Sequence, residues 1–360
     1  MGAPSRNHYV VAVPQELPAG VVLACRDLDA NQRFFATLGF RLDRVFPADA
    51  PRQVELSAFG LTVCLRRSER DGGGHLRLPA DERRTLQAPN GACVELGRPL
   101  HPQAITKTTP TFRIWRAHDL GGFHDGRAGM AYRDLLPDRL GGAVIVSHIR
   151  VARGGPVPDY VHFHHVQAQV LYVIAGWVRV VYQDQGPPFV LHVGDCVVQP
   201  PQLRHRVLEC SDGFEVIEVA SPAEHVTCVD HEMTLPTSTR HADRTFSGQR
   251  CHHHVASASP TRAAADAGLV ERDCGIADAT NGRVGVRVLR RDASTAPSRI
   301  ATAASLRLWL PQTGTLTVNG EALGRGDTCV LPALQHATVT AASADLELLE
   351  FSLRLDANEP

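Results

Sequence analysis

Three histidines lie within four positions of the segment HFHHVQAQVLYVIAG, which spans residues 162–176. In an extended strand, side chains alternate between two faces, so His162 and His164 point to one side and His165 to the other. Imidazole nitrogens are frequent ligands of zinc, iron and other transition metals. The segment therefore predicts two ligands of a metal site, with His165 as a surface or edge residue. A third ligand has to come from another strand.

His205 is the candidate for that third ligand. It lies in GDCVVQPPQLRHRVLEC, residues 194–210, where a Gly-Asp turn, a strand and a Pro-Pro turn precede it. This order of turns and strands is expected to deliver His205 onto a neighbouring antiparallel strand. The three imidazoles would then converge inside one β structure.

The elements around these histidines are short β-branched segments separated by turn residues every eight to twelve positions, which is typical of a sandwich or barrel. The same order recurs later in the chain. Residues 132–151 align with 271–289, and GDCVVQPPQLRHRV aligns with GDTCVLPALQHATV. One barrel is therefore predicted to be duplicated, with a linker rich in Ser, Thr, His and Ala between the copies.

The two histidine segments resemble the two motifs of the cupin superfamily. His162, His164 and Gly176 match the first motif, and Gly194, Pro200 and His205 match the second. The resemblance implies double-stranded β-helix (jelly-roll) barrels and a metal held by the histidines.

Two positions differ from the cupin motifs. Gln169 stands where glutamate is usual, so it is expected to ligate the metal as a fourth donor, to hydrogen-bond a bound water, or to turn away. It does not titrate and cannot act as a general base. Glu209 stands where the second motif often has asparagine, and it either accepts a bond from a ligand N–H inside the cavity or faces solvent.

In the second copy, Ile300, Thr302 and Arg307 replace His162, His164 and Gln169, and His336 is interpreted as the counterpart of His205. This copy is predicted to be free of metal and to serve in packing, as in bicupins in which one half has lost its site.

The N-terminal part has the order β-α-β-β-β. Residues 21–46 are predicted to form a strand, a helix and a second strand. A hairpin follows in VELSAFGLTVCLRR, and APNGACVEL supplies a further strand. These segments resemble one module of the vicinal oxygen chelate (glyoxalase) superfamily. Glu95 matches a ligand position of that family, but the first-strand position falls near Gly20, which has no ligand atom. A structural or dimerising role is expected.

The chain is thus predicted to be mainly β, with two cupin barrels after an α+β module. The expected parts are the module at 18–98, the metal-binding barrel at 110–225, the linker at 226–262 and the degenerate barrel at 263–356. A group of further residues lies in or near the motifs and is predicted to line the substrate pocket: Tyr160, Tyr172, Arg179, Gln199, Arg204 and Glu209. For Tyr172 and Arg179, wall packing or a surface ion pair is an equal alternative.

Three neutral imidazoles leave the charge of a divalent cation uncompensated, which favours an anionic or enolisable oxygen ligand. The expected function is an iron(II) dioxygenase acting on a small oxygen-chelating organic acid, diketone or aromatic. Zinc, manganese, nickel and copper remain alternative metals. The alternatives in function are a non-oxidative isomerase, decarboxylase or hydrolase, and a bicupin that binds a small ligand without turnover.

A formal net charge of −1 supplies no basic surface for nucleic acid or an anionic membrane. The sequence contains nine cysteines without any C-x-x-C pair, which indicates reduced thiols, and no leader or apolar span is evident, so a cytoplasmic location is expected. The resemblance to cupins, whose barrels often pair through edge strands, implies a homodimer. The tract CHHH at 251–254 is interpreted as part of the linker and not as a second metal site.

Overall fold

A computed structural model describes residues 20–37, 40–58, 60–69, 75–79, 82–87, 93–97, 108–264, 268–292, 299–300 and 305–354. The chain divides into two compact units. The first comprises Met1–Pro47, Pro51–Pro102 and Asp356–Pro360, and the second comprises Ala48–Ala50 and Gln103–Leu355. The predicted division into four parts is finer than these units and stays a prediction.

The first unit contains one helix and a mixed sheet. Its elements are β1 (Gly20–Cys25), α1 (Leu28–Thr37), β2 (Arg41–Phe46), β3 (Gln53–Ala58), β4 (Leu61–Arg67), β5 (His75–Pro79), β6 (Arg84–Gln87) and β7 (Cys93–Gly97). The sheet order within the unit is β2-β3-β4-β1-β5-β7-β6, with β1 parallel to β4. Asp27 caps the helix by accepting a 2.8 Å bond from the backbone N–H of Ala30.

The predicted order of this unit is present, but β5 and β6 were not expected from the arginine- and glycine-rich segment between β4 and β7. Glu95 lies on β7, and its side chain is outside the described residues. The relationship to the vicinal oxygen chelate superfamily stays a prediction.

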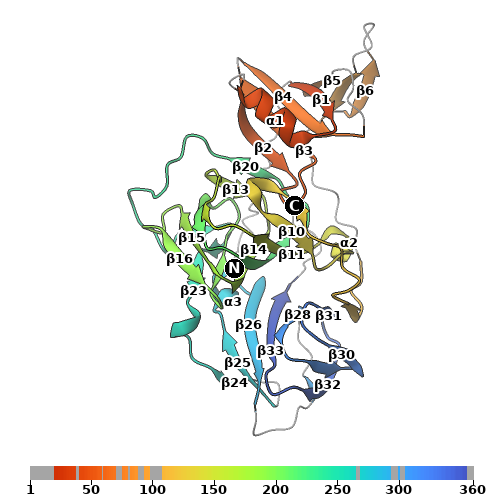
Figure 1. Cartoon of the computed structure of the whole chain (residues 1–360), viewed down its shortest axis with the longest axis vertical. Coiled ribbons are helices and arrows are strands. Elements are labelled where there is room, and N and C mark those ends of the chain that lie inside the picture. Colours follow the sequence, from red (N-terminus) through yellow and green to blue (C-terminus); the bar gives the residue numbers. More distant parts are fainter. Residues whose placement is uncertain are drawn as a thin grey trace, which may run out of the picture. The chain divides into compact units, whose positions relative to one another are not determined.

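The second unit begins with a barrel made of two facing sheets (Figure 1). One sheet has the order β16-β15-β18-β13-β20, and the other has the order β23-β17-β14-β19-β11-β10-β9. The bounds are β9 (His124–Asp125), β10 (Ala131–Asp134), β11 (Ile145–Val151), β12 (Gly155–Pro156, paired with β18), β13 (His162–His164), β14 (Ala168–Ala175), β15 (Trp177–Tyr182), β16 (Phe189–His192), β17 (Cys196–Val198), β18 (His205–Cys210), β19 (Phe214–Ser221), β20 (Thr227–Val229) and β23 (His252–His254).

A second barrel follows in the same unit. Its sheets have the orders β24-β25-β26-β33-β28-β31-β8 and β27-β32-β29-β30. The bounds are β8 (Arg113–Trp115), β24 (Arg262–Ala263), β25 (Leu269–Asp273), β26 (Val284–Arg291), β27 (Arg299–Ile300), β28 (Leu306–Thr313), β29 (Leu316–Val318), β30 (Glu321–Leu323), β31 (Thr328–Leu331), β32 (Ala337–Ala342) and β33 (Glu347–Leu353). The expected fold class, mainly β with two cupin barrels after an α+β module, is confirmed.

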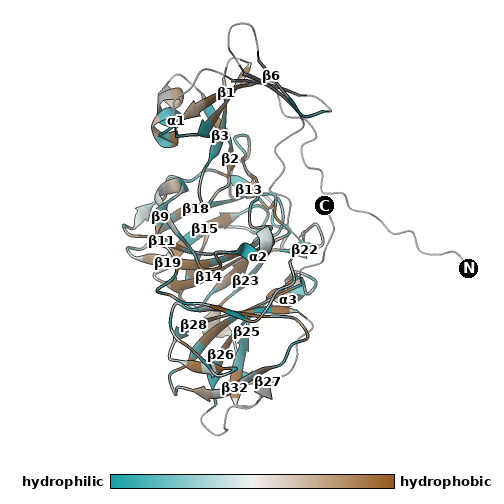
Figure 2. Ribbon diagram, turned by 90° about the vertical axis from the view of Figure 1, so that its right-hand side faces the viewer, coloured by the Kyte–Doolittle hydropathy of each residue, from teal (hydrophilic) through white to brown (hydrophobic). Residues whose placement is uncertain are grey.

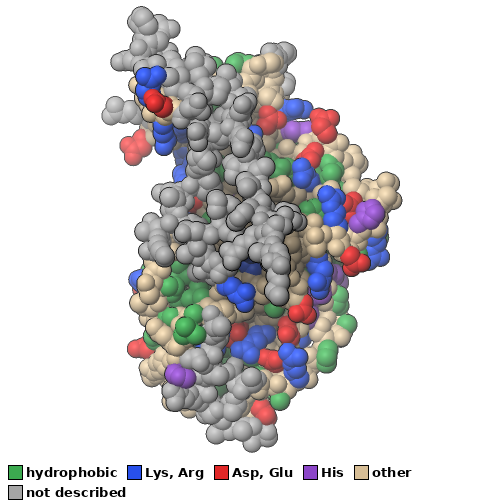
Figure 3. Space-filling model, turned by 180° about the vertical axis from the view of Figure 1, so that it is seen from behind, with side chains coloured by type: hydrophobic (Ala, Val, Ile, Leu, Met, Phe, Trp, Pro, Cys, Tyr) green, Lys and Arg blue, Asp and Glu red, His purple; other side chains and the backbone are tan. Residues whose placement is uncertain are grey.

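Short helices and one small hairpin complete the unit: η1 (Arg127–Gly129), α2 (Arg139–Gly142), η2 (Ala256–Ala258), α3 (Ile276–Ala279), and β21 (Thr245–Phe246) paired with β22 (Gln249–Arg250). No helix in the described ranges is long and apolar enough to cross a membrane. On the face of the second unit seen in Figure 3, acidic and basic side chains are interspersed, and no large patch of one sign is visible.

The larger sheets of the two barrels share one hydrophobic core. Val170 and Val219 from the first barrel belong to the same buried cluster as Val286, Leu308 and Phe351 from the second. Apolar colour is concentrated on strands such as β14, β19 and β26 in Figure 2. The barrels are therefore joined by a packed interior, and each also has a separate core of its own.

Two short strands cross the predicted boundary between the barrels. β8 precedes the first barrel in the sequence but pairs with β31 of the second. β23, which was expected to be linker, pairs with β17 of the first barrel. Each strand covers an edge that would otherwise present unpaired backbone groups.

The strand register corrects one residue of the predicted duplication. Val180 pairs with Val207 beside a bulge in the first barrel, and Val318 pairs with Val339 beside the matching bulge in the second. Val207 and Val339 are therefore equivalent, and the residues two positions before them are His205 and Ala337. Ala337, not His336, thus stands at the position of His205. His336 is exposed just before β32. The prediction matched histidine with histidine, but His336 lies one position before Ala337 and so has the opposite strand parity.

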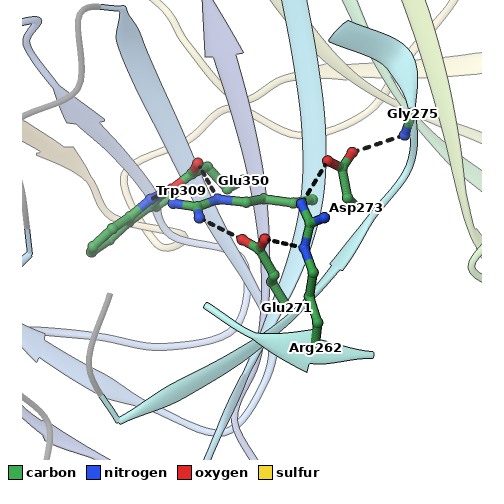
Figure 4. A network of polar contacts seen from close by, with 7 residues as sticks. Arg262, Glu271, Asp273, Gly275, Trp309 and Glu350 are labelled. Carbon is green, nitrogen blue, oxygen red and sulfur yellow. Dashed lines mark hydrogen bonds and ion pairs between the residues drawn. The ribbon is translucent and has the colours of Figure 1, made fainter. Parts of the chain in front are cut away.

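The interior of the second barrel is filled by a network of charged and aromatic side chains (Figure 4). Arg287 donates to Glu350 at 2.7 Å and to Glu271 at 2.7 Å, and the Trp309 indole N–H donates to Glu350 at 2.6 Å. By register, Arg287 and Trp309 occupy the places of Ser147 and Leu171 in the first barrel. Larger side chains thus close the second barrel.

We expect Glu350→Gln to lower the free energy of unfolding by about 1–3 kcal/mol, because it removes the charge that the partly buried Arg287 and the buried Trp309 share. Urea denaturation of the full chain measures this change. The matched control is Glu347→Gln, whose exposed pair with Arg290 is worth about 0–1 kcal/mol. Equal effects of the two changes would contradict a structural role for the network.

Candidate metal centre

The three predicted histidines come together in the first barrel. His162 and His164 lie on β13, and His205 is the first residue of β18, directly opposite His162. One ring nitrogen from each lies within 4.8 Å of the others. All three residues are buried: 2% of the surface of His162, 5% of His164 and 4% of His205 is exposed. Among the described residues, these three histidines form the group of side chains that could hold a metal ion.

The alternation along β13 sets this geometry, as predicted. His162 and His164 are buried, whereas Phe163 between them is only partly buried and lies under the guanidinium of Arg204. The turn before β18 is fixed by a backbone bond from Gln202 to the His164 carbonyl. Strand pairing and this turn therefore aim the three imidazoles at one point.

Each imidazole is held through its Nδ1 atom. His162 Nδ1 lies 2.8 Å from the Tyr160 carbonyl oxygen, and His205 Nδ1 lies 2.8 Å from the Leu203 carbonyl oxygen. His164 Nδ1 lies 2.9 Å from Thr227 Oγ1. A carbonyl oxygen can only accept, so Nδ1 of His162 and His205 carries the proton and Nε2 carries the lone pair. This is the tautomer that ligates metals through Nε2.

Burial keeps the three rings neutral. It lowers the pKa of His162 to about 4, with a further contribution from the charge of Arg127. Burial also lowers the pKa of His164 and His205 well below the usual value, and the neighbouring histidines add to the effect. Neutral imidazoles with free lone pairs are the form required for metal binding.

Gln169 lies on β14 and lines one cavity together with the three histidines. Only 2% of its surface is exposed. Its Nε2 donates a short hydrogen bond to Glu218 on the neighbouring strand β19, and its Oε1 has no hydrogen-bond partner among the described residues. Burial raises the pKa of Glu218, although the bond from Gln169 opposes this. Glu218 was not predicted, because it lies in the β-branched segment GFEVIEV, where no motif marks it.

Arg127 is the other functional residue that was missed. Its guanidinium donates to Asp159 at 2.7 Å and to His162 Nε2 at 2.8 Å. Arg127 lies in the turn between β9 and β10, in a glycine-rich segment. Only the pairing of β10 with β9 on one side and β11 on the other brings this turn to the cavity.

These groups line a cavity of about 80 Å³. Besides the three histidines, its polar lining includes Asp49, Arg127, Gln169, Gln199, Glu218 and His225, and the rest is mostly apolar, with residues such as Met130, Leu171 and Val180. A space of this size accepts a molecule of a few heavy atoms.

Gln199 is the one further predicted pocket residue that lines the cavity, where it donates to Tyr182 at 2.8 Å. Tyr160 is 49% exposed, and only its backbone carbonyl serves the site. Tyr172 is buried between the barrels, where Arg272 contacts its hydroxyl at 3.4 Å. The Tyr160 side chain therefore does not line the cavity, and Tyr172 fits the alternative of wall packing.

Arg179, Glu209 and Arg204 also lie outside the cavity. Arg179 and Glu209 are cross-strand partners and form a 2.9 Å ion pair on the outer face of the barrel. Arg204 pairs with Asp230 at 3.1 Å. A bulge at Leu208 of β18 shifts the register between the pairs Arg179–Glu209 and Val180–Val207, so Glu209 does not share the face of His205.

The tract 251–254 forms strand β23, contrary to the expected linker, but its histidines do not converge. His252 Nε2 contacts the Cys274 carbonyl at 3.1 Å, the ring of His253 stacks on Phe189 at 4.6 Å, and His254 is buried beside Ser259. His165 lies just past β13, its ring 5.5 Å from that of Phe163 and outside the cluster. The eight cysteines whose side chains are described are free thiols.

The donor set fits a divalent cation. Three neutral Nε2 atoms face one another, and the unpartnered Gln169 Oε1 lines the same space. One contact competes with a metal, because Arg127 donates to the Nε2 of His162.

Comparison with known proteins agrees with this geometry. Residues 147–218 match the family model described as "Cupin domain". The protein Ylba from E. coli is similar over 72% of this chain and 97% of its own, with 12% identity and a TM-score of 0.50. A deletion mutant of Bacillus subtilis oxalate decarboxylase is 14% identical over 71% and 80% of the two chains (TM-score 0.51). Lactobacillus farciminis oxalate decarboxylase in a formate complex is 11% identical over 71% and 90% (TM-score 0.51).

A search of curated proteins by sequence gives no significant match. At 11–14% identity, the structural similarities establish the fold alone. Fold and site together define a protein with cupin barrels, one of which carries a buried histidine triad. The match to the cupin domain covers residues 147–218, and the three clustered histidines lie inside it.

We expect Thr227→Val to weaken metal binding on the order of tenfold, since it removes the oxygen that contacts His164 Nδ1 while keeping the side-chain volume. Competition with a chromophoric chelator measures the affinity. Thr245→Val, at an exposed position on β21, is the control. Unchanged binding in Thr227→Val would show that this contact does not orient the ring.

The metal-free protein is expected to lose stability as the pH falls from 6.5 towards 4. In this pH window His162 is protonated in the unfolded chain but largely neutral in the folded protein, where its pKa is about 4. Protonation of this residue therefore lowers the free energy of unfolding by up to about 3 kcal/mol. Urea denaturation at pH 7 and pH 5 in the presence of a chelator measures the effect. A His162→Leu variant should show a weaker pH dependence, and an equal dependence in both proteins would contradict the assignment.

Proposed function

We propose that the first barrel is the centre of a metal-dependent enzyme that acts on a small organic acid. The observation that carries this proposal is the set of three buried, neutral imidazoles facing one another in a cavity that also contains Arg127. His162, His164 and His205 would hold the metal, and Gln169 Oε1 would be a fourth donor or would bind a ligand of the metal. When bound, the cation supplies Lewis acidity and, in the case of iron, redox chemistry with dioxygen.

The side chains around this centre select the substrate. The Arg127 guanidinium supplies a positive charge and planar donors suited to a carboxylate. The cavity of about 80 Å³ favours a small acid over an aromatic compound. The apolar wall, which includes Leu171 and Val180, excludes water and strengthens charge interactions with a bound anion.

An iron(II) dioxygenase is the first reaction class that we propose, because an apolar cavity wall suits dioxygen beside the substrate. A specific observation favours a second class, a non-oxidative decarboxylase or related lyase. Burial raises the pKa of Glu218, so its carboxyl group is suited to hold a proton beside the reacting molecule. Two of the structurally similar proteins are oxalate decarboxylases, and the Bacillus subtilis enzyme has Mn(II) centres.

Elemental analysis of untagged protein tests the metal centre. We expect roughly one equivalent of iron or manganese in the wild type and a large loss in His205→Ala, because two imidazoles hold a metal poorly. His336→Ala, at an exposed position of the second barrel, is the matched control and should keep its metal. Metal retained in His205→Ala would remove the basis of the proposal.

Turnover of a panel of small carboxylic acids, diketones and catechols separates the reaction classes. Oxygen uptake with product formed only in air supports a dioxygenase. Release of carbon dioxide under nitrogen supports the non-oxidative class. Tight ligand binding without product under either gas would contradict an enzymatic role and indicate a binding protein.

A further inference from the structure

The Nε2 atom of His162 has two possible partners that exclude each other. A neutral imidazole has one lone pair, and the Nδ1–H of His162 is already committed to the Tyr160 carbonyl oxygen at 2.8 Å. Arg127 donates to Nε2 at 2.8 Å, and a metal would need the same lone pair. His162 therefore contacts either Arg127 or a cation through this atom.

Arg127 is anchored in a way that allows this exchange. Its backbone turn is closed by a bond from Gly126 N–H to Met130 and another from Met130 N–H to Arg127. Its Nη1 atom is fixed separately by Asp159 at 2.7 Å. A guanidinium has five donors, so rotation about the contact with Asp159 can release His162 while the ion pair is kept.

The released guanidinium would need a new acceptor. Asp159 already accepts from Arg127 through one oxygen and from Val207 N–H at 3.0 Å through the other. The Nε atom of Arg127 is buried and has no partner among the described residues, although the side chain lines the cavity. A small anion in the cavity would satisfy these donors.

We propose that Arg127 couples metal binding to the binding of a small carboxylate: the anion draws the guanidinium away from His162 and so frees Nε2 for the metal. This inference rests on the proposed metal centre and adds the mechanism that controls its occupancy. A carboxylate of a few heavy atoms matches both the planar donors and the volume of the cavity. Each ligand then raises the affinity for the other by the same factor.

Cobalt(II) titration of the chelator-treated full-length protein, with and without acetate, tests the coupling. In the wild type, acetate is expected to raise cobalt affinity about fivefold or more. The double variant Arg127→Met/Asp159→Asn removes both charges, so no buried charge is left unpaired. It should bind cobalt roughly tenfold more tightly without acetate, because nothing competes for His162, and acetate should then have little effect.

Two further variants complete the design. Arg127→Gln keeps one hydrogen-bond donor for Asp159 and replaces the double variant if that protein does not fold, as judged by circular dichroism. Arg150→Met removes an exposed arginine of β11 that contacts Phe123 and should behave as the wild type does.

The outcomes separate this inference from the metal centre itself. Equal or weaker cobalt binding in the Arg127 variants, or an acetate effect as large as in the wild type, would overturn the coupling while leaving the metal centre in place. Failure of the wild type and all variants to bind cobalt would overturn the metal centre and the coupling together.

Discussion

The chemistry of the first barrel depends on three hydrogen bonds to imidazole Nδ1 atoms. Backbone carbonyl oxygens of Tyr160 and Leu203 hold His162 and His205, and the Thr227 hydroxyl holds His164. Because these contacts use the Nδ1 atoms, the Nε2 lone pairs face the cavity, and burial keeps the rings from taking up protons. Everything that the cavity is proposed to bind depends on this one orientation.

The duplication provides an internal comparison for the same framework. Glu218 and Glu350 occupy equivalent strand positions in the two barrels. In the second barrel, Arg287 and Trp309 fill the interior and bind the carboxylate, so the residue has a structural role. In the first barrel, the equivalent positions are the small Ser147 and Leu171, and Glu218 lines an open cavity. These two positions thus carry smaller side chains beside the cavity of the first barrel and larger side chains in the second.

Much of the architecture could be predicted from local patterns. Strand alternation predicted that His162 and His164 share a face, and turn spacing predicted the place of His205. The pocket was less predictable: Gln199 lines it, whereas Tyr172 and Arg179 do not. Bulges and the shared core between the barrels change which face a strand residue occupies, and neither feature has a local sequence signal.

By itself, the sequence determined most of the elements and the parity of the ligand strand, because both follow from the periodicity of neighbouring residues. Only the tertiary structure decided that Arg127 meets His162 and that Glu218 meets Gln169. These contacts join residues 35 and 49 positions apart. They exist because antiparallel pairing brings distant strands and turns into one barrel, and the physical reason is the register of that pairing, which no short segment specifies.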